Sequence, residues 1–360
     1  MPTFLEMPRL RMSSGAAETG GDGAPGPRRR LQDSFGRVAT DLRVSLTDRC
    51  NLRCTYCMPA DGLDWMPGEE ILTDDEILRL IEVGVTQLGI TTVRLTGGEP
   101  LLRKNLEQMV TDISAMVPAP SIALTTNGIG LAARADRLAA AGLRRINVSL
   151  DTLDPATFKQ ITRRPRLSDV LAGVTAARRA GLDPVKINTV LMRGVNDHEA
   201  VDLLQWAMRE GVQLRFIEQM PLDAQHSWQR TTMITAAEIR ERLSQQVQLI
   251  EDPDDAATRG SAPAELFRVV STDYAVGIIA AVTKPFCGNC DRVRLTADGQ
   301  VRNCLFARAE SDLRTPLRDG ASDQELADLW VTAVAGKRAG HGIDDPTFLQ
   351  PDRPMSAIGG

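Results

Sequence analysis

The chain has 360 residues, 42% hydrophobic and 25% charged, which are ordinary proportions for a globular protein with room for one large or two modest domains. Its 42 lysines and arginines against 47 aspartates and glutamates give a net charge of -5, and only 4% of residues are aromatic, so neither a basic surface nor base-stacking platforms indicate nucleic-acid binding. No apolar run is long enough to cross a bilayer.

Residues 1–36 are rich in Gly, Ser and Pro, contain three arginines at 28–30 and show little apolar periodicity. This composition predicts a flexible leader. Glu6, Glu18 and Asp22 count against a mitochondrial presequence, and nothing indicates a secretory signal. We therefore expect the chain in the cytoplasm, where thiols stay reduced.

Three cysteines follow the first strand-like run, residues 41–46. Cys50, Cys54 and Cys57 have the spacing C-x-x-x-C-x-x-C. Three thiolates this close suit a cuboidal iron–sulfur cluster, and three ligands instead of four leave one iron free to bind a non-protein ligand. An iron with an open position is a reaction site.

Other interpretations of this loop are a zinc knuckle, a disulfide pair with a spare thiol, and three unrelated cysteines. Zinc prefers four ligands, and no fourth Cys or His lies near the loop in the sequence. A disulfide is disfavoured in a reducing compartment. The agreement of spacing and context favours the three-cysteine cluster.

Residues 37–260 alternate short β-branched runs with longer amphipathic ones, the pattern of repeated βα units. Strands are predicted at residues 41–46, 92–96, 122–125, 146–150, 185–190 and 214–217. A capping box at 73–76 opens a helix to about residue 88, and helices are also predicted at 106–116, 132–141, 169–180 and 199–209. Gly142, Gly181 and Gly211 are placed to end three of them. Six strands rather than eight suggest an incomplete barrel, although an open doubly wound sheet has the same pattern.

Polar residues gather at these strands and their carboxyl ends, where both folds place their chemistry. They occupy residues 96–100, 125–128, 147–151 and 218–221, together with Lys186, Asn188 and Arg215. We expect the site at this end of the sheet.

The periodicity changes after about residue 261. The apolar run 276–282 predicts a strand, residues 323–335 predict a helix, and the chain ends in an irregular tail, Ile358-Gly359-Gly360. We therefore divide the chain into a leader (1–36), a barrel (37–260), a C-terminal iron–sulfur domain (261–345) and a tail (346–360).

A second set of cysteines lies in the C-terminal part. Cys287 and Cys290 form a C-x-x-C motif, and Cys304 follows a basic stretch. With His341 these residues would make a structural Cys3His zinc site. Two three-cysteine sets in one chain also fit two clusters, each with an open iron.

The first loop, with Tyr56 before its last cysteine, resembles that of the radical S-adenosylmethionine (SAM) enzymes. The resemblance implies an α/β fold, an incomplete (β/α)6 TIM-like barrel with a C-terminal cluster-binding extension. It also implies that the open iron binds SAM and that the reduced cluster splits SAM to a 5′-deoxyadenosyl radical. The SAM contacts implied are Tyr56, Gly98, Glu99, Ser149 and Met220.

The second set resembles a narrower family. The segment 286–296, then Asp298-Gly299, Cys304-Leu305 and the double-glycine end are similar to radical SAM lyases that cyclise GTP in the first step of molybdenum cofactor biosynthesis. This resemblance extends from about residue 35 to 360. It implies two [4Fe-4S] clusters, with guanine at the second, abstraction of the ribose 3′ hydrogen and attack of the resulting radical on C8.

A triphosphate carries about four negative charges, so an acidic chain must concentrate cations around it. The GTP contacts expected by position and resemblance are Arg43, Arg94, Thr125, Lys186, Arg215, Arg292, Val293 and Arg294. The resemblance also places Gly359 and Gly360 in the active site with the first cysteine set. Arg338 and Ala357 depart from the residues that this family often has there.

The resemblance further implies an electron donor such as flavodoxin or ferredoxin, a downstream cyclic pyranopterin monophosphate synthase, and a homodimer as one assembly. Two alternatives stay open at this point. One is a radical SAM enzyme that modifies a peptide or cofactor and carries an auxiliary cluster. The other is a zinc-stabilised binding protein without catalysis.

Overall fold

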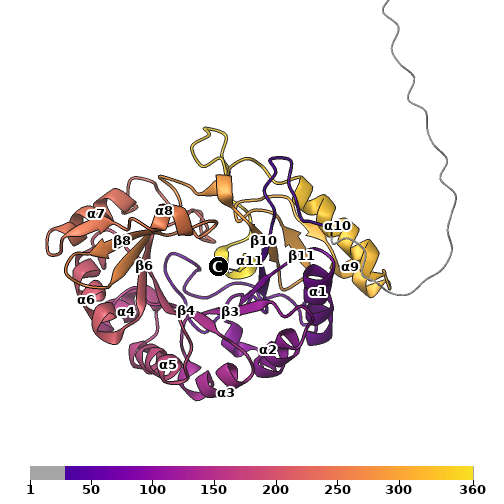
Figure 1. The fold of residues 1–360 in the computed structure, drawn as a ribbon, viewed down its shortest axis with the longest axis horizontal. Coiled ribbons are helices and arrows are strands. Elements are labelled where there is room, and N and C mark those ends of the chain that lie inside the picture. Colours follow the sequence, from indigo (N-terminus) through magenta and orange to yellow (C-terminus); the bar gives the residue numbers. More distant parts are fainter. Residues whose placement is uncertain (1–28, 360) are drawn as a thin grey trace, which may run out of the picture.

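The computed structural model describes residues 29–359. One twelve-stranded sheet runs in the order β12-β11-β10-β1-β2-β3-β4-β5-β6-β9-β8-β7. Its central strands are all parallel, since β1 to β6 follow in sequence order, β10 pairs with β1 and β9 pairs with β6. The sheet curves into a ring with helices outside it (Figure 1). This is the expected incomplete TIM-like barrel.

All six predicted barrel strands are confirmed to within one residue at each end. They are β1 (Asp41–Ser45), β2 (Thr92–Thr96), β3 (Ser121–Thr126), β4 (Arg145–Ser149), β5 (Val185–Val190) and β6 (Gln213–Ile217). Apolar side chains at alternate positions, such as Leu42 and Val44 on β1, point outward into the core beneath the helices. The intervening positions, which include Arg43, face the barrel interior.

The strands after residue 245 extend the same sheet. They are β7 (Leu249–Glu251), β8 (Glu265–Val269), β9 (Ala275–Ile279), β10 (Arg292–Leu295), β11 (Gln300–Arg302) and β12 (Ser311–Asp312). The predicted strand 276–282 corresponds to β9 and ends earlier. Strand β10 was not predicted, because it is four residues long and two of them are arginines. The proposed domain boundary at residue 260 stays a prediction.

The helices lie around the outside of the barrel, except α11, which lies inside it (Figure 1). They are α1 (Asp74–Thr86), α2 (Leu106–Ser114), α3 (Ala135–Ala140), α4 (Pro155–Thr162), α5 (Leu167–Arg179), α6 (Ala200–Glu210), α7 (Ala236–Ser244), α8 (Asp255–Thr258), α9 (Arg314–Arg318), α10 (Asp323–Ala335) and α11 (Met355–Ile358). The capping box of Thr73 and Glu76 and the whole of α10 are confirmed. The predicted helix 132–141 is instead a short 3-10 turn followed by α3.

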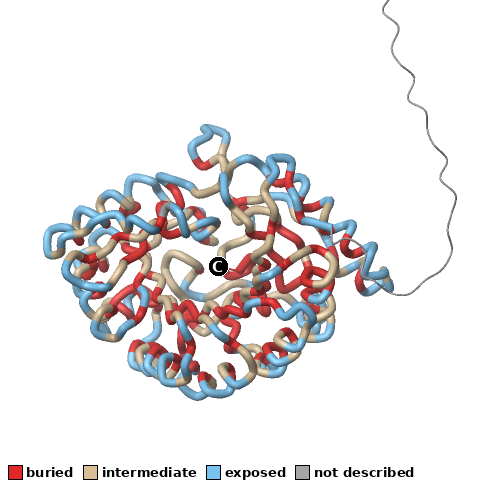
Figure 2. Tube along the Cα trace, viewed as in Figure 1, coloured by how far each residue is buried: buried red, intermediate tan, exposed pale blue. Residues whose placement is uncertain are grey.

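The main core lies between the strands and the surrounding helices, where buried segments alternate with exposed outer turns (Figure 2). Val293 on β10 and Trp330 on α10 are fully buried in it. Val293 was predicted to contact GTP, but its side chain points outward because the flanking Arg292 and Arg294 take the inward positions. Its side chain therefore does not join the site.

Two terminal predictions need correction. Residues 31–36 are not a flexible leader, because Leu31 is fully buried and Gln32 forms a bridge with Val38. The rest of that prediction lies largely outside the described residues. The tail is not wholly irregular, because it ends in helix α11, which lies inside the ring of strands (Figure 1). Among residues 29–359, no helix has the length and apolar character needed to span a membrane.

Candidate active site

The first cysteine loop begins just beyond the carboxyl end of β1. Backbone N–H groups of Arg53 and Thr55 donate to the carbonyl oxygens of Thr162 (3.0 Å) and Ile161 (2.9 Å), which fixes the loop on the end of α4. Within the loop, the N–H of Cys57 donates to the carbonyl of Cys54 (2.9 Å). The tight turn keeps its three thiols together.

The three thiols influence one another electrostatically. Burial raises the pKa of Cys50, Cys54 and Cys57, the last to about 12. Neighbouring thiols of the same loop raise the pKa of Cys54 and Cys57 further, whereas Glu99 does so for Cys50. Bound iron would supply the positive charge that holds such thiols as thiolates. Among the described residues, no three His, Cys, Asp or Glu side chains converge closely enough to hold a single metal ion. A cuboidal cluster distributes its cysteines over three irons, so its ligands need not meet at one point.

The Gly97-Gly98 turn after β2 packs tightly on the start of this loop. The N–H of Gly98 donates to the carbonyl of Thr47 (2.7 Å), and that of Glu99 donates to the carbonyl of Arg49 (2.8 Å). A Cβ at Gly98 would lie 2.3 Å from the Arg49 oxygen, so only glycine fits. Gly98 was predicted to contact SAM, and in the structure its missing Cβ makes room for the backbone of the cysteine loop.

Glu99 is fully buried directly behind that turn. Its carboxylate accepts hydrogen bonds from Thr126 Oγ1 (2.6 Å) and from the backbone N–H groups of Asn127 (2.7 Å) and Leu101 (2.9 Å). Burial raises its pKa to about 7, and these hydrogen bonds oppose the rise. A ligand ammonium group would find here a carboxylate that ionises near neutral pH.

The predicted SAM residues beyond Glu99 lie on the same side of the barrel. Tyr56 donates its phenolic hydrogen to Oδ2 of Asp151, which lies just past β4 (2.7 Å). This hydrogen bond links the cysteine loop to the end of the sheet. Burial raises the pKa of Asp151 to about 6. Ser149 is the last residue of β4 and is partly exposed. Met220 packs partly buried beside Leu222 after β6.

The second cysteine set lies at the opposite end of the barrel. Cys287 and Cys290 immediately precede β10, the parallel neighbour of β1, whereas the first set follows β1. The N-terminal hairpin supports this loop, because Arg37 donates to the carbonyl oxygens of Cys287 (2.7 Å) and Ala339 (2.8 Å). Burial and the neighbouring Cys290 and Cys304 raise the pKa of Cys287. The three thiols of this set therefore also lie near one another.

His341 does not complete a Cys3His zinc site. Its Nδ1 accepts from the N–H of Ile343 (3.0 Å), and its Nε2 lies 3.2 Å from the carbonyl oxygen of Ala281. Both ring nitrogens are therefore engaged by backbone groups. The ring also stacks at a tilt on Phe306, with centroids 5.0 Å apart.

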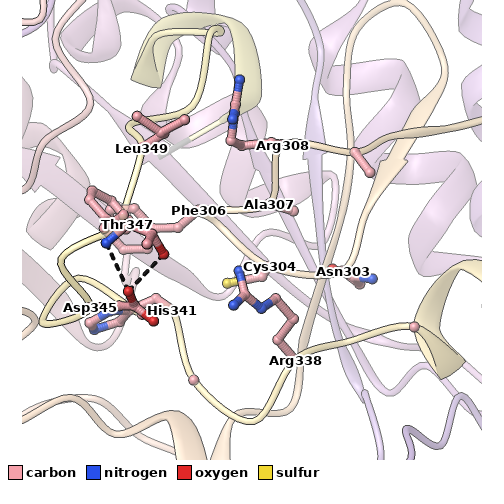
Figure 3. Close-up of a pocket in the computed structure, with 15 residues that line it drawn as sticks. Asn303, Cys304, Phe306, Ala307, Arg308, Arg338, His341, Asp345, Thr347 and Leu349 are labelled. Atoms are coloured by element: carbon pink, nitrogen blue, oxygen red, sulfur yellow. Dashed lines mark hydrogen bonds between the residues drawn. The ribbon is translucent and has the colours of Figure 1, made fainter.

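A cavity of about 340 Å³ opens beside this set (Figure 3). Cys304, Phe306 and Phe348 contribute to its wall, and Arg308 and Arg338 line it as cations. Cys304, one of the three cysteines of the second set, is therefore accessible from this cavity.

Cations line the barrel interior between the two cysteine sets. The strand register places Arg43 beside Arg294 on one side and beside Arg94 on the other. The whole set comprises Arg43, Arg94, Arg145, Lys186, Arg215, Arg292 and Arg294.

Five of these arginines have a buried Nε without a hydrogen-bond partner in the described part of the chain, namely Arg43, Arg94, Arg145, Arg215 and Arg292. Leaving a buried charged donor unsatisfied is costly. The only carboxylate paired with the set is that of Asp41, 4.0 Å from Arg94 among the described residues. An anionic ligand would satisfy this arrangement.

Electrostatic strain in the set is visible in its pKa values. Burial, followed by repulsion from neighbouring arginines, lowers the pKa of Lys186 to about 8 and that of Arg215 to about 9. The same causes, in the same order, lower the pKa of Arg294 to about 10. A bound polyanion would reverse this repulsion.

Arg145 was missed in the sequence, where it looks like an ordinary charge at a strand start. Its guanidinium donates to Ser121 Oγ (3.0 Å) and contributes to the repulsion on Arg94 and Lys186. Asn147 was noted only as part of a polar run. It accepts from Arg215 (2.9 Å) and donates to Thr125 Oγ1 (3.3 Å), which orients two predicted GTP contacts.

The tail enters the space between the cysteine sets. Ser356 on α11 lies beside Cys57 and lowers the pKa of that thiol, and the carbonyl oxygen of Gly359 accepts from Arg294 Nε (3.4 Å). Gly359 has a φ of 78°, and a Cβ there would lie 2.5 Å from Ser45 Oγ. Gly360 lies outside the described residues.

Comparison with known proteins agrees with this geometry. Residues 44–207 match the Radical SAM superfamily, and residues 212–343 match the family Molybdenum Cofactor Synthesis C. In fold, the chain is similar to Streptococcus suis SuiB bound to S-adenosylmethionine (TM-score 0.56, 12% identity, covering 83% of this chain and 68% of that one). It is likewise similar to anSMEcpe with bound AdoMet (TM-score 0.55, 15% identity, covering 85% and 79%). The fold and the cysteine loop define a radical SAM enzyme.

Curated relatives give the narrower assignment. The GTP 3′,8-cyclase of Streptomyces coelicolor is 61% identical over 330 residues, covering 92% of this chain and 96% of the relative. That of Mycolicibacterium smegmatis is 56% identical over 366 residues, covering 99% of each. The chain belongs to the GTP 3′,8-cyclase family.

Proposed function

We propose that this chain converts GTP to (8S)-3′,8-cyclo-7,8-dihydroguanosine 5′-triphosphate in the first step of molybdenum cofactor biosynthesis. The observation that carries the proposal is the cation-lined interior between two cysteine sets, with five buried guanidinium nitrogens lacking partners among the described residues. A nucleoside triphosphate supplies the acceptors that these donors need. Family membership accounts for the choice of GTP.

The proposal includes two [4Fe-4S] clusters. Cys50, Cys54 and Cys57 would hold the first, and Cys287, Cys290 and Cys304 the second. When bound and reduced, the first cluster supplies the electron that splits SAM to a 5′-deoxyadenosyl radical. The guanine of GTP would occupy the open iron of the second, with its ribose directed along the barrel toward the first.

The chain's own residues would orient both ligands. For SAM we propose Glu99 as the partner of the amino group, with contacts from Tyr56, Gly98, Ser149 and Met220. For the triphosphate we propose the barrel cations and Thr125, and we add Arg145 to them. Gly359 lies against Arg294, so the tail would close the space around the ribose and phosphates.

An acidic electron-transfer protein, such as a flavodoxin or ferredoxin, is the reductant that we propose. Arg53 Nη1 donates to the carbonyl oxygens of Cys50 (2.7 Å) and Leu52 (2.8 Å), and Arg163 Nη1 donates to that of Arg53 (2.8 Å). Exposed Arg49 and Arg164 flank this loop, and in the described part of the chain none of the four arginines pairs with an acid. A basic rim beside the first cluster favours an acidic donor.

We place the reaction in the cytoplasm, because all six cysteines are free in the structure and the chemistry needs them reduced. A cyclic pyranopterin monophosphate synthase would consume the product. The homodimer remains a prediction.

One anaerobic assay tests the function. The reconstituted chain is incubated with SAM, a reductant and one nucleotide at a time, and the products are separated by liquid chromatography. We expect a cyclic product from GTP and none from ATP, CTP or UTP. Cleavage of SAM without any nucleotide product would contradict the cyclase assignment and would favour a different radical SAM substrate.

A further inference from the structure

Lys337 is a buried cation with no acidic side chain bonded to it in residues 29–359. It follows the carboxyl end of α10 and is 4% exposed. Its Nζ donates to the carbonyl oxygens of Cys290 (3.1 Å) and Arg292 (3.0 Å) and to Cys290 Sγ (3.4 Å). By contrast, Lys284 is an exposed lysine whose Nζ lies 2.6 Å from Glu265.

Burying an ammonium group without a compensating negative charge is expensive. Two carbonyl oxygens satisfy donors but supply no net charge. The third acceptor is the sulfur of a cysteine that precedes β10, and a metal-bound cysteine is a thiolate. A negative charge on the Cys290 thiolate would therefore compensate the buried ammonium group of Lys337.

The position of the ammonium group is fixed from several sides. Helix α10 begins at a capping box formed by Ser322 and Glu325, and Trp330 anchors its middle in the core. The N–H of Lys337 donates to the carbonyl of Val334 (3.0 Å), and a cation at a helix carboxyl end is favoured by the helix dipole. The backbone of Lys337 is thus held at the carboxyl end of α10.

We propose that Lys337 is a positioning residue for the second iron–sulfur cluster, acting through the Cys290 thiolate and compensating the negative charge of the cluster. The inference rests on the two-cluster proposal above. A core of charge 2+ with three thiolates sums to one negative charge, and reduction adds another. An ammonium bonded to one thiolate favours the reduced state, because charge and hydrogen bonds to sulfur set the potential of such clusters. Lys337 therefore makes the second cluster easier to reduce.

The test is an EPR-monitored reductive titration of the reconstituted full chain, with SAM added to identify the signal of the first cluster. Lys337→Met removes the charge and nearly keeps the shape, Lys337→Arg keeps the charge, and Lys284→Met is the matched control. At the wild-type midpoint of the second cluster we expect Lys337→Met to lower the ratio of reduced to oxidised cluster about tenfold, which is about 59 mV for one electron. Lys337→Arg should recover most of that change, and Lys284→Met should leave both potentials in place.

The outcomes separate this inference from the proposed function. If a Lys337→Met chain holds two clusters with unchanged potentials, the role of Lys337 is overturned and the two-cluster proposal is not affected. Loss of iron from the second cluster in Lys337→Met, with retention of that iron in Lys337→Arg, would support the role of Lys337. Loss of iron in both variants would contradict it, because the shape of the lysine side chain and not its charge would then be what matters. A wild-type chain with iron for only one cluster would overturn the two-cluster proposal and this inference with it.

Discussion

Arg145 shows at the scale of one residue how an ordinary surface charge in the sequence becomes part of a site. It stands at the start of β4 beside Arg144, and the sequence does not distinguish the two. In the structure Arg144 is exposed, whereas the Arg145 Nε is buried and has no hydrogen-bond acceptor among residues 29–359. The direction of a side chain at a strand's first residue depends on the sheet that forms around it.

We expect Arg145→Met to weaken GTP binding about tenfold, because one charge-assisted contact to phosphate is worth roughly 1.5 kcal/mol. The matched control is Arg144→Met, which removes the same charge from the surface and should bind GTP as the wild type does. Equilibrium binding of GTP to the reconstituted chain measures both. Equal affinities in the two variants would show that Arg145 does not face the nucleotide.

Glu99 provides a pH prediction. Burial raises the pKa of Glu99 to about 7, above the value of 4.5 in an unfolded chain. The charged carboxylate therefore destabilises the fold. The contribution of Glu99 to the free energy of unfolding falls as the pH rises from about 4.5 to about 7. Binding of the SAM ammonium group should respond in the opposite sense, because it favours the carboxylate. We expect SAM to bind more tightly as the pH rises through about 7.

The measurement is the dissociation constant of SAM as a function of pH for the wild type and for Glu99→Gln. The amide keeps the size of the side chain and cannot ionise, so the variant should bind weakly at every pH. A wild-type profile that is flat between pH 6 and pH 7.5, or the same slope in both proteins, would show that Glu99 does not face the ammonium group.

At the scale of elements, the predictable parts were those with a strong local signal. The six barrel strands follow from apolar runs, and α1 and α10 follow from capping residues and amphipathic periodicity. Strand β10 was not predictable in this way, because it is short and its inward residues are arginines. It is stabilised by pairing with β1, which lies about 250 residues earlier in the chain. A local sequence pattern does not indicate so distant a pairing partner.

The tail is the element whose role is most easily tested. Gly359 has a positive φ and no room for a Cβ, since one would lie 2.5 Å from Ser45 Oγ and 2.8 Å from Thr96 Cγ2. Gly359→Ala should therefore displace the tail and lower turnover at least about tenfold, while the melting temperature changes by less than about 2 °C.

Gly68→Ala is the control for that variant, because Gly68 is exposed and an added Cβ meets no atom within 4 Å. Turnover and thermal unfolding are measured on the same reconstituted preparations. Full turnover in Gly359→Ala would mean that the tail is not part of the working site. A large loss of melting temperature would mean that the tail acts on folding.

At the scale of the whole molecule, the two cysteine sets lie at opposite ends of adjacent parallel strands, with the arginines of β1 and β10 between them. The spacing of the first set predicted an iron–sulfur cluster, whereas the spacing of the second set alone left a zinc site open. The distance and direction between the sets could not be predicted, because they depend on how β10 closes against β1. The same pairing brings Arg43 and Arg294 side by side, which explains why the cations converge.

This arrangement predicts that the two sets can be disabled separately. Cys57→Ser should abolish SAM cleavage and leave the iron of the second set in place. Cys290→Ser should still cleave SAM and should lose productive GTP binding. Iron content, 5′-deoxyadenosine formation and cyclic product, measured together, test both variants. Wild-type SAM cleavage in Cys57→Ser, or full cyclisation in Cys290→Ser, would reverse the assigned roles.

The central claim is that a radical made at one end of the barrel reaches the ribose of a GTP held at the other. The most direct measurement uses GTP deuterated at the ribose 3′ carbon and mass spectrometry of the 5′-deoxyadenosine formed in a single anaerobic turnover. We predict one deuterium in the 5′-deoxyadenosine, together with one equivalent of cyclic product. Unlabelled 5′-deoxyadenosine alongside cyclic product would contradict this account.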